Sequence, residues 1–296
     1  MTLQTILFHY GTFQPDWQQP GLIQAGPQMT DGPQSLPLRE CSAPAILRGL
    51  AQRGCPHHGV LLHYSDPFMM RSSPLRDVRA WPGPRLLACG DLHHGPGPID
   101  TLVSYLNAEP HDAVLLTFNP SLVNKVQSRM NKPVRSLPPT FFNYPSAKRS
   151  ASPRLELLHV GTLGPHHPRR RELIEALNAR RRIPLRHTTT NSPEEASVLY
   201  AQHALVLNVP LNNDLNHRFF EVMAAGVPQV VFGDPGLVGE HQGLAQRPDV
   251  FWASTVESLE ELVLQLLTEP KILQAIPVQP PPVWPIKDLL KAAFTP

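Results

Sequence analysis

The chain has 296 residues, of which 41% are hydrophobic and 17% are charged, a composition ordinary for a folded globular protein. This length exceeds the roughly 100–200 residues of one domain, so two compact units are expected. The formal net charge of +2 provides no strong field and no general reason to expect a nucleic-acid partner. The three cysteines form no CxxC pair, which argues against a disulfide framework or a cysteine-rich zinc site.

Targeting and membrane segments are not expected. No uninterrupted apolar run approaches the roughly 18–20 residues that a bilayer span needs. The segment from Met1 to Tyr10 lacks the charged leader of a signal peptide and resembles a first strand. We therefore expect a cytoplasmic protein without a membrane span, of undetermined oligomeric state.

The first half of the chain alternates short apolar strands with helices. Strands are predicted at Thr5–His9, Gly59–His63, Leu86–Cys89 and Asp112–Phe118, and helices at Pro44–Arg53 and Ile99–Asn107. The stretch from Gly11 to Pro37 is rich in Pro, Gly and Gln and is predicted to be a long loop. This alternation predicts a parallel sheet.

A proline-rich segment separates the two halves. It runs from Val134 to Arg154 and carries the basic pair Lys148-Arg149, a composition typical of a linker. We place the boundary near Ala151. The predicted division is a first domain over residues 1–150, a second over residues 151–276, and a C-terminal segment over residues 277–296 with a last helix at Ile286–Phe294.

The second half restarts the alternation. Strands are predicted at Leu155–Val160, near Leu185, and at Ala204–Val209 and Gln229–Phe232; helices are predicted at Arg169–Arg181, after the cap Ser192, and at His217–Ala225 and Ser258–Thr268. The predicted fold is α/β, with two Rossmann-like domains that face one another across a cleft. In such sheets ligands bind at the carboxyl ends of the strands.

The most informative stretch extends from Asn208 to Glu240. It contains Asn208-Val209-Pro210, the run from Arg218 to Pro228, RFFEVMAAGVP, and Gly236-Leu237-Val238-Gly239-Glu240. Arg218 and Glu221 are three residues apart on a predicted helix, so a cation for phosphate and a carboxylate for a vicinal diol share one face. The helix N-terminus also suits an anion. An isolated Arg-x-x-Glu pair is more often a surface salt bridge, but the turn at Gly226-Val227-Pro228 favours a binding site.

This stretch resembles the donor-binding signature of the two-Rossmann-domain GT-B glycosyltransferases, and in particular the CgeB-like, spore-maturation-type members. The likeness covers Leu155 to about Pro270. It implies that Glu221 binds the ribose of a nucleotide, and that Asn208, Arg218 and Gly226 belong to the donor site. It also implies that the first domain binds the acceptor, and that the C-terminal helix crosses back to it.

A second motif, Val160-Gly161-Thr162-Leu163-Gly164, follows a predicted strand and precedes Arg169-Arg170-Arg171. It resembles the first loop of the donor domain in the same family, with Gly161 and Thr162 beside the donor and Arg169 or Arg171 on its diphosphate. Three arginines at a helix N-terminus oppose the helix dipole, and a bound anion would compensate them. By itself the pattern is equally typical of an ordinary turn and a solvated arginine run.

The first domain contributes Asp91, His93 and His94, directly after a predicted strand. Any of them could act as a general base on an acceptor hydroxyl or hold the transferred sugar. A polar turn and half of a metal site are the other readings. No matching ligand cluster is identifiable elsewhere in the sequence, so no metal is expected.

One position departs from the family pattern. Retaining members of the wider superfamily often carry another Glu eight positions before the ribose Glu, and here that position is Asn213. The sugar-contacting acid is therefore missing, replaced, or supplied by Asp214. The stereochemistry of transfer is left open.

The sequence thus predicts a metal-independent glycosyltransferase with no cofactor, which uses a UDP- or GDP-linked sugar as donor and a hydroxyl of a glycan, small molecule or modified DNA base as acceptor. Lys125, Arg129, Lys132 and Arg135 form the modest basic stripe that motivates the DNA alternative. Two other functions remain open: a sugar-nucleotide epimerase of the same fold, and a non-catalytic sugar-nucleotide-binding protein.

Overall fold

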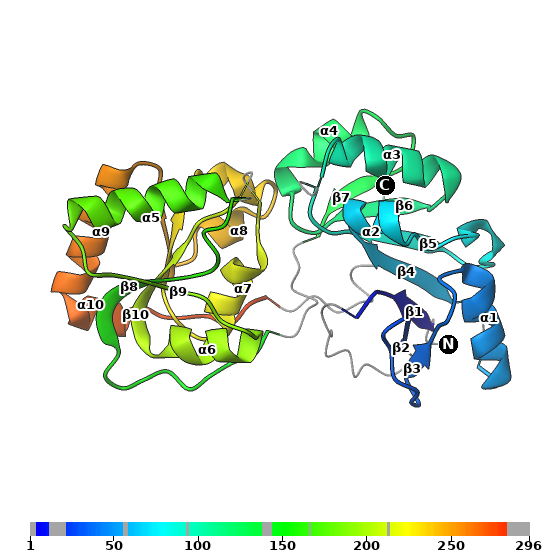
Figure 1. Cartoon of the computed structure of the whole chain (residues 1–296), viewed down its shortest axis with the longest axis horizontal. Coiled ribbons are helices and arrows are strands. Elements are labelled where there is room, and N and C mark those ends of the chain that lie inside the picture. Colours follow the sequence, from blue (N-terminus) through cyan, green and yellow to red (C-terminus); the bar gives the residue numbers. More distant parts are fainter. Residues whose placement is uncertain are drawn as a thin grey trace. The chain divides into compact units, whose positions relative to one another are not determined.

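The computed structural model describes residues 4–11, 22–55, 59–92, 95–137, 144–165, 167–211 and 214–282. The chain divides into two compact units, of which the second begins at Tyr144. In Figure 1 the first unit is coloured from blue to blue-green and the second from green to red. Among the described residues, no helix is long and apolar enough to cross a membrane.

The first unit contains a seven-stranded parallel sheet with the order β3-β2-β1-β4-β5-β6-β7. Its strands are β1 (Thr5–Phe8), β2 (Leu22–Gly26), β3 (Ser35–Pro37), β4 (Val60–Ser65), β5 (Arg85–Cys89), β6 (Ala113–Leu116) and β7 (Val134–Ser136). The order reverses between β1 and β4. This is the switch point at which doubly wound sheets bind ligands.

Two sequence predictions are wrong in this unit. The segment from Gly11 to Pro37 was predicted to be a loop, but it contains β2 and β3, and β7 opens the stretch predicted to be linker. These strands have three to five residues, too few to show a periodic pattern between prolines and glycines. Parallel pairing with β1, β2 and β6 determines their conformation instead.

The helices of the first unit are α1 (Ala43–Gln52), α2 (Pro67–Ser72), α3 (Pro98–Ala108) and α4 (Val123–Gln127), with short 3₁₀ turns η1 (Val78–Ala80) and η2 (Pro120–Leu122). Side-chain caps start two of them: Ser42 accepts from the N–H of Ala45, and Asp66 accepts from the N–H of Met69. Helix α1 packs on the sheet face that carries Phe8 and Leu61. Helices α2, α3 and α4 pack on the same face where it carries Leu87 and Val114. Residues of the opposite face, such as Leu7, Leu62, Leu86 and Leu115, are also buried.

The second unit has a five-stranded parallel sheet with the order β12-β11-β10-β8-β9. Its strands are β8 (Arg154–Val160), β9 (Leu185–Thr188), β10 (His203–Asn208), β11 (Gln229–Phe232) and β12 (Val250–Ala253). Its helices are α5 (Pro168–Arg180), α6 (Pro193–Ala201), α7 (His217–Ala224), η3 (Pro235–Val238), α8 (Gln242–Ala245), α9 (Val256–Thr268) and α10 (Pro270–Ala275). Strand β12 was not predicted, because its sequence is short and follows the turn-rich stretch after Phe232.

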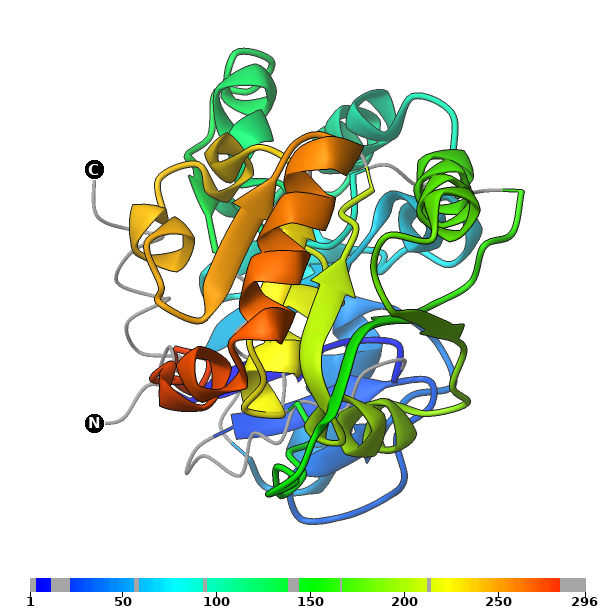
Figure 2. The same ribbon diagram turned by 90° about the vertical axis from the view of Figure 1, so that its left-hand side faces the viewer.

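Alternate residues of the central strands give this sheet two apolar faces. Leu157 and Leu205 pack with α5 and α9, whereas Leu158 and Val206 pack with α6 and α7. Because side chains alternate along a strand, this pattern predicts a sheet covered on both sides. Figure 1 shows α5 and α6 on opposite sides of the sheet, and in Figure 2 α9, in orange, crosses in front of the strands.

Residues just before the predicted boundary at Ala151 pack against the second unit. The Tyr144 hydroxyl lies 2.9 Å from His217 Nδ1, and its ring stacks on Phe220 at 6.0 Å. Farther along, Ser150 donates its N–H to the carbonyl of Ala201. The predicted boundary at Ala151 therefore lies inside the second unit.

The start of the predicted C-terminal segment also lies on the second unit. A buried ion pair between Arg247 and Asp249 holds it: Arg247 donates to the carbonyls of Gln279 and Pro280, and Asp249 accepts from the Gln279 N–H. The predicted helix at Ile286–Phe294 lies outside the described residues.

A buried histidine pair occupies the core of the first unit. His63 on β4 and His111, just before β6, lie 3.3 Å apart between Nδ1 and Nε2, and Tyr105 of α3 contacts both rings. Both imidazoles are buried, and burial lowers the pKa of His111 to about 4 and holds the pKa of His63 well below its usual value of 6.5. Both histidines are therefore neutral in the folded protein near neutral pH.

This pair predicts a loss of stability in acid. Between pH 6.5 and about 4 the unfolded chain binds more protons at His111 than the folded chain does. The contribution of neutral His111 to the free energy of unfolding is therefore complete above pH 6.5 and is lost as the pH falls. We expect His111→Gln to reduce the loss of unfolding free energy over this window by on the order of 3 kcal/mol. The measurement is chemical unfolding across the window. The exposed His187, changed to Gln, is the control, and identical pH slopes for both variants would contradict the prediction.

Candidate functional site

The site is built at the carboxyl ends of β8, β9 and β10. Gly161 directly follows β8 and has φ +148°, a backbone conformation that other residues rarely adopt. Its N–H donates to the carbonyl of Thr188, and its carbonyl accepts from His187 Nε2 at 2.7 Å. The end of β9 therefore fixes the peptide planes on both sides of Gly161.

Two guanidinium groups converge on Gly161. A Cβ added to this glycine would lie 2.6 Å from Arg218 Nη2 and 3.3 Å from Arg170 Nη1. Arg170 comes from the first turn of α5 and donates to the carbonyl of Thr162, and Arg218 comes from the first turn of α7. A side chain at position 161 would occupy this space, so the close approach requires glycine.

Arg170 is buried and Arg218 is half-buried, and neither forms a close ion pair with a carboxylate that the structure describes. Arg170 is only 6% exposed, and Nε of both Arg170 and Arg218 is buried without a hydrogen-bond partner. No ion pair within 4.0 Å joins either guanidinium to a carboxylate of the described residues. Burial, followed by the neighbouring charge of Arg218, lowers the pKa of Arg170 to about 10, although Asp214 acts in the opposite direction. Two guanidiniums therefore meet at Gly161, and the charges of Asp214 and Glu221 oppose theirs without an ion pair within 4.0 Å.

An amide pair positions the helix that carries Arg218. Asn216 caps α7 by accepting from the N–H of Phe219, and its Nδ2 donates to Oδ1 of Asn208 at 3.1 Å. Asn208 is the last residue of β10 and is buried. This contact joins the strand end to the start of the helix, so Asn208 determines where the first turn of α7 lies.

Glu221 lies one turn farther along α7, on the same side as Arg218. It accepts a hydrogen bond at Oε2 from the hydroxyl of Tyr200, at 3.2 Å, and Tyr200 on α6 is 1% exposed. Burial raises the pKa of Glu221 above 4.5, whereas Arg218 and the tyrosine hydroxyl lower it. The carboxylate is thus held in a partly dry environment next to a cation.

A pocket of about 290 Å³ lies beside these groups, and Arg170 and Asn208 are not among the residues that line it. Gly161, Thr162, Arg218, Glu221 and Tyr200 line one part of it, and the loop from Thr189 to Pro193 lines another. Sequence reasoning missed this loop, Tyr200 and Arg170. The loop follows β9, which pairs in parallel with β8 through Val160 and Thr188, so the strand order would have placed it at the same edge.

The structure separates the arginines of the predicted cluster. Arg169 and Arg171, the two candidates from the sequence, are exposed, whereas Arg170 turns inward to Gly161. Gly226 lies beyond the last turn of α7 and does not line the pocket; its φ of +68° lets the chain leave the helix toward β11. Roles in donor binding for Arg169, Arg171 and Gly226 stay predictions from the resemblance.

Two carboxylates lie at neighbouring strand ends of the first unit. Asp91 follows β5, and Asp66, which the sequence reasoning did not single out, follows β4. Burial raises the pKa of Tyr64, and the charges of Asp91 and then Asp66 raise it further. The loop after Asp91 is fixed by the Leu92 N–H, which donates to Asn119 Oδ1. His93 and His94 lie outside the described residues.

The first unit also contains a larger pocket, of about 710 Å³, between α2 and α3. None of the residues predicted for the site lines it. Its Arg71 is engaged by the carbonyl of Pro96 and the hydroxyl of Thr101, and its Glu109 accepts from the backbone of Asp77 and Val78. These contacts give Arg71 and Glu109 a structural role. Over the described ranges, no cluster of three or more His, Cys, Asp or Glu side chains could hold a metal ion.

Comparisons with known proteins relate this chain to glycosyltransferases. Residues 169–278, which include α5, α6 and α7, match a family described as Glycosyl transferase-like. No curated protein matches the chain. Among solved structures, sucrose-phosphate synthase from Thermosynechococcus elongatus is similar over 97% of this chain and 87% of its own, with 13% identity and a TM-score of 0.53.

Two other solved structures are similar at lower scores. The catalytic domain of starch synthase IV from Arabidopsis thaliana, bound to ADP and acarbose, has 10% identity over 84% of this chain and 74% of its own, with a TM-score of 0.43. S. aureus TarM, in a complex that includes UDP, has 10% identity over 77% of this chain and 52% of its own, with a TM-score of 0.47. The likeness to the synthase, with the two parallel sheets, shows an α/β fold of the GT-B type with two Rossmann-like domains.

The close approach at Gly161 predicts the effect of a single methyl group. In Gly161→Ala the new Cβ would lie 2.6 Å from Arg218 Nη2 on a strained backbone, so Arg218 must move. We expect a loss of about 1–3 kcal/mol of unfolding free energy and at least a severalfold weaker binding of inorganic pyrophosphate. Calorimetric titration and chemical unfolding test both expectations.

Gly164 provides the matched control, because it lies in the same loop and a Cβ there would meet nothing within 4 Å. Gly164→Ala should leave both measurements unchanged. If the two variants behave alike, the close approach of Arg218 to Gly161 has no functional consequence.

Proposed function

We propose that this chain is a glycosyltransferase, which moves a sugar from a nucleoside diphosphate-sugar to an acceptor hydroxyl. The observation that supports this best is the pair of guanidiniums, the buried Arg170 and the half-buried Arg218, that meet at Gly161 on the side of the pocket where Glu221 lies. The family match over residues 169–278 covers both arginines and the carboxylate. To bind a nucleoside diphosphate, a site needs cations for the phosphates, a hydrogen-bond acceptor for the ribose diol and a backbone that the phosphates can approach closely. Arg170 with Arg218, Glu221 and Gly161 match these three needs.

The charge at the site favours a diphosphate over a single neutral ligand. Two cations near one glycine repel each other, and burial increases the cost of keeping Arg170 ionised. A diphosphate carries enough negative charge to neutralise the pair, and each guanidinium has several N–H donors for its oxygens. The first turns of α5 and α7 add partial positive charge.

Glu221 suits the sugar hydroxyls of the nucleoside. An ionised carboxylate can accept hydrogen bonds from vicinal hydroxyl groups. Helix α7 places Glu221 one turn from Arg218, and both side chains line the pocket. The loop from Thr189 to Pro193 provides hydroxyl and amide groups for the remaining part of the nucleoside. We propose UDP- or GDP-linked sugars as donors and, from the likeness over Leu155 to about Pro270, the CgeB-like subtype.

In the proposed reaction, the bond between the anomeric carbon and the diphosphate oxygen breaks, and the diphosphate leaves with the electron pair. The acceptor oxygen forms the new bond to the anomeric carbon, and its proton passes to a base of the first unit. Asp91, His93 and His94 are the candidates for this base. Arg170 and Arg218 stabilise the charge that develops on the leaving group, so we propose catalysis without a metal ion.

The acceptor we propose is a hydroxyl of a glycan or small molecule. A modified DNA base is less well supported, because carboxylates neutralise part of the basic stripe. Arg129 pairs with Asp100 at 2.6 Å, and Asp112 lies close enough to Lys132 to affect its pKa. A surface for the DNA backbone needs cations that are available to phosphates.

The donor site is tested with a panel of nucleoside diphosphates and their sugar conjugates. We expect UDP or GDP to raise the melting temperature of the wild-type chain, and Arg170→Gln and Arg218→Gln each to weaken binding by about tenfold or more, because each removes a charge-assisted contact. Arg171→Gln removes one charge from the same cluster at an exposed position and is the control.

If Arg171→Gln weakens binding as much as Arg170→Gln does, Arg171 belongs to the donor site as the resemblance implies, and the distinction between the inward and the exposed arginine is wrong. A chain that binds no nucleotide or nucleotide sugar would refute the proposed function.

The products formed distinguish transfer from the other functions. We expect slow release of free diphosphate from the donor without acceptor, at the same rate in a chelator as without it, because the arginines supply the positive charge. Product analysis by chromatography checks both expectations. Interconversion of nucleotide sugars would instead indicate an epimerase, binding without turnover a non-catalytic protein, and inhibition by the chelator a metal requirement.

A further inference from the structure

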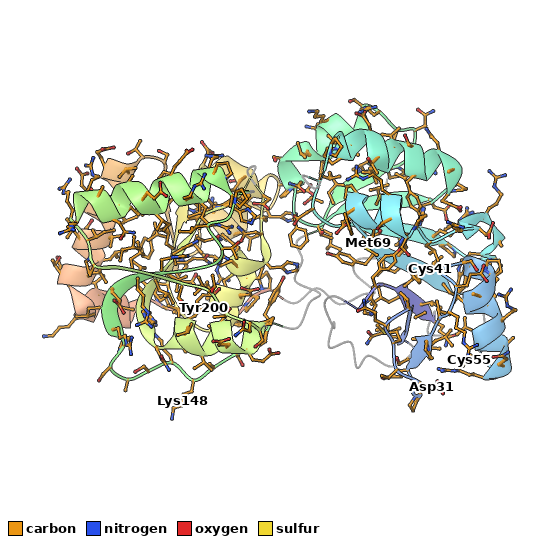
Figure 3. The ribbon with its side chains drawn as sticks, in the orientation of Figure 1. Asp31, Cys41, Cys55, Met69, Lys148 and Tyr200 are labelled. Atoms are coloured by element: carbon orange, nitrogen blue, oxygen red, sulfur yellow. The ribbon has the colours of Figure 1, made fainter. Side chains whose placement is uncertain are left out.

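Tyr200 is the only tyrosine lining the donor pocket among the residues described there, and the proposed reaction does not use it. It comes from α6, a different helix from the one that carries Arg218 and Glu221. Its ring is 1% exposed and packs among apolar residues of β8, β10 and α7. Figure 3 labels Tyr200 in the interior of the second unit, on the side of α6 toward the sheet.

The hydroxyl of Tyr200 lies within an electrostatic network. It donates to Glu221 Oε2 at 3.2 Å, and the Arg218 guanidinium lies beside the same hydroxyl. Burial raises the pKa of Tyr200 and the charge of Arg218 opposes this, so the phenol stays protonated and can only donate to the carboxylate. Glu221 lines the pocket, and no hydrogen bond joins its second oxygen, Oε1, to a described residue.

We propose that Tyr200 is a positioning residue for Glu221, which holds the carboxylate so that Oε1 receives the ribose hydroxyls of the donor. This inference rests on the proposed function, because it assumes that the pocket binds a nucleotide. It assigns different partners to the two oxygens of the Glu221 carboxylate: Tyr200 donates to Oε2, and the ligand binds to Oε1. The discrimination between ribose and sugars without these hydroxyls therefore depends on Tyr200, which does not itself touch the ribose.

Two physical consequences follow from this arrangement. A glutamate side chain has rotatable bonds that must be fixed before it can bind, and a hydrogen bond from a buried ring fixes them in advance. The same bond stabilises the ionised form, which burial alone disfavours, since burial raises the pKa of Glu221. Loss of the hydroxyl should therefore weaken the recognition of the diol more than the recognition of the diphosphate.

The test measures binding of UDP and GDP, and of the 2′,3′-dideoxy form of each, by calorimetric titration to the full chain. For the nucleotide that binds, we expect the wild-type chain to prefer the ribose form by about tenfold or more, since a lost hydrogen bond to a charged group has this effect. In Tyr200→Phe this preference should fall to near one, while the affinity for the dideoxy form changes little. Glu221→Gln should lose the preference as well.

The two substitutions should not be additive. If Tyr200 acts through Glu221, the variant Tyr200→Phe with Glu221→Gln should show the same preference as Glu221→Gln alone. Tyr105→Phe is the matched control, because it removes another buried hydroxyl, bound to the carbonyl of Leu75 in the first unit. It should retain the full preference.

The outcomes separate this inference from the proposed function. If Tyr200→Phe lowers stability but keeps the wild-type preference for ribose, Tyr200 is structural and the inference is wrong, whereas the function stands. If the wild-type chain binds neither UDP nor GDP, both are wrong. Should Tyr200→Phe not fold, Glu221→Gln decides: a retained preference for ribose there overturns the inference.

Discussion

The convergence of Arg170 and Arg218 on Gly161 is the constraint on which the rest of the site depends. Two like charges, one buried and one half-buried, are unfavourable unless something compensates them, and no carboxylate of the described residues forms an ion pair with either one. The protein holds them there through rigid elements: β9 fixes the peptides around Gly161, and the Asn208–Asn216 contact fixes the start of α7. Under the proposed function an anionic ligand neutralises both charges, and the rigid elements hold the two guanidiniums in place before it binds.

The strand order explains why these groups meet. Strand β8 lies between β10 and β9, so the residues that follow the three strands share one edge of the sheet. The loop after β8 supplies Gly161, the helix after β10 supplies Arg218 and Glu221, and the loop after β9 completes the pocket. Strands β8 and β10 carry apolar residues on both faces, because helices cover the sheet on each side. Packing thus provides the rigidity that the polar groups need.

The candidate site could be predicted from the sequence in part. The run from Arg218 to Pro228 placed a cation and a carboxylate on one helical face, and Gly161 marked the close backbone approach, both of which the structure contains. The choice among three successive arginines was predictable from helical spacing but was missed. Arg170 lies three, four and seven residues before Leu173, Ile174 and Leu177, so it shares the inward face of α5 with them, whereas Arg169 and Arg171 are exposed. Tyr200 was missed because its partner lies on another helix.

The sequence by itself determined the alternation of strands and helices, the caps at Ser42, Asn216 and Ser192, and the turn at Gly226, because each depends on interactions within a few residues. Tertiary structure alone decided that the short segments β2, β3 and β12 are strands, since their hydrogen bonds are made to distant segments. It also decided that Arg170 and Arg218 meet at Gly161 and that Tyr200 holds Glu221. These are contacts between elements, and no local pattern in the chain specifies them.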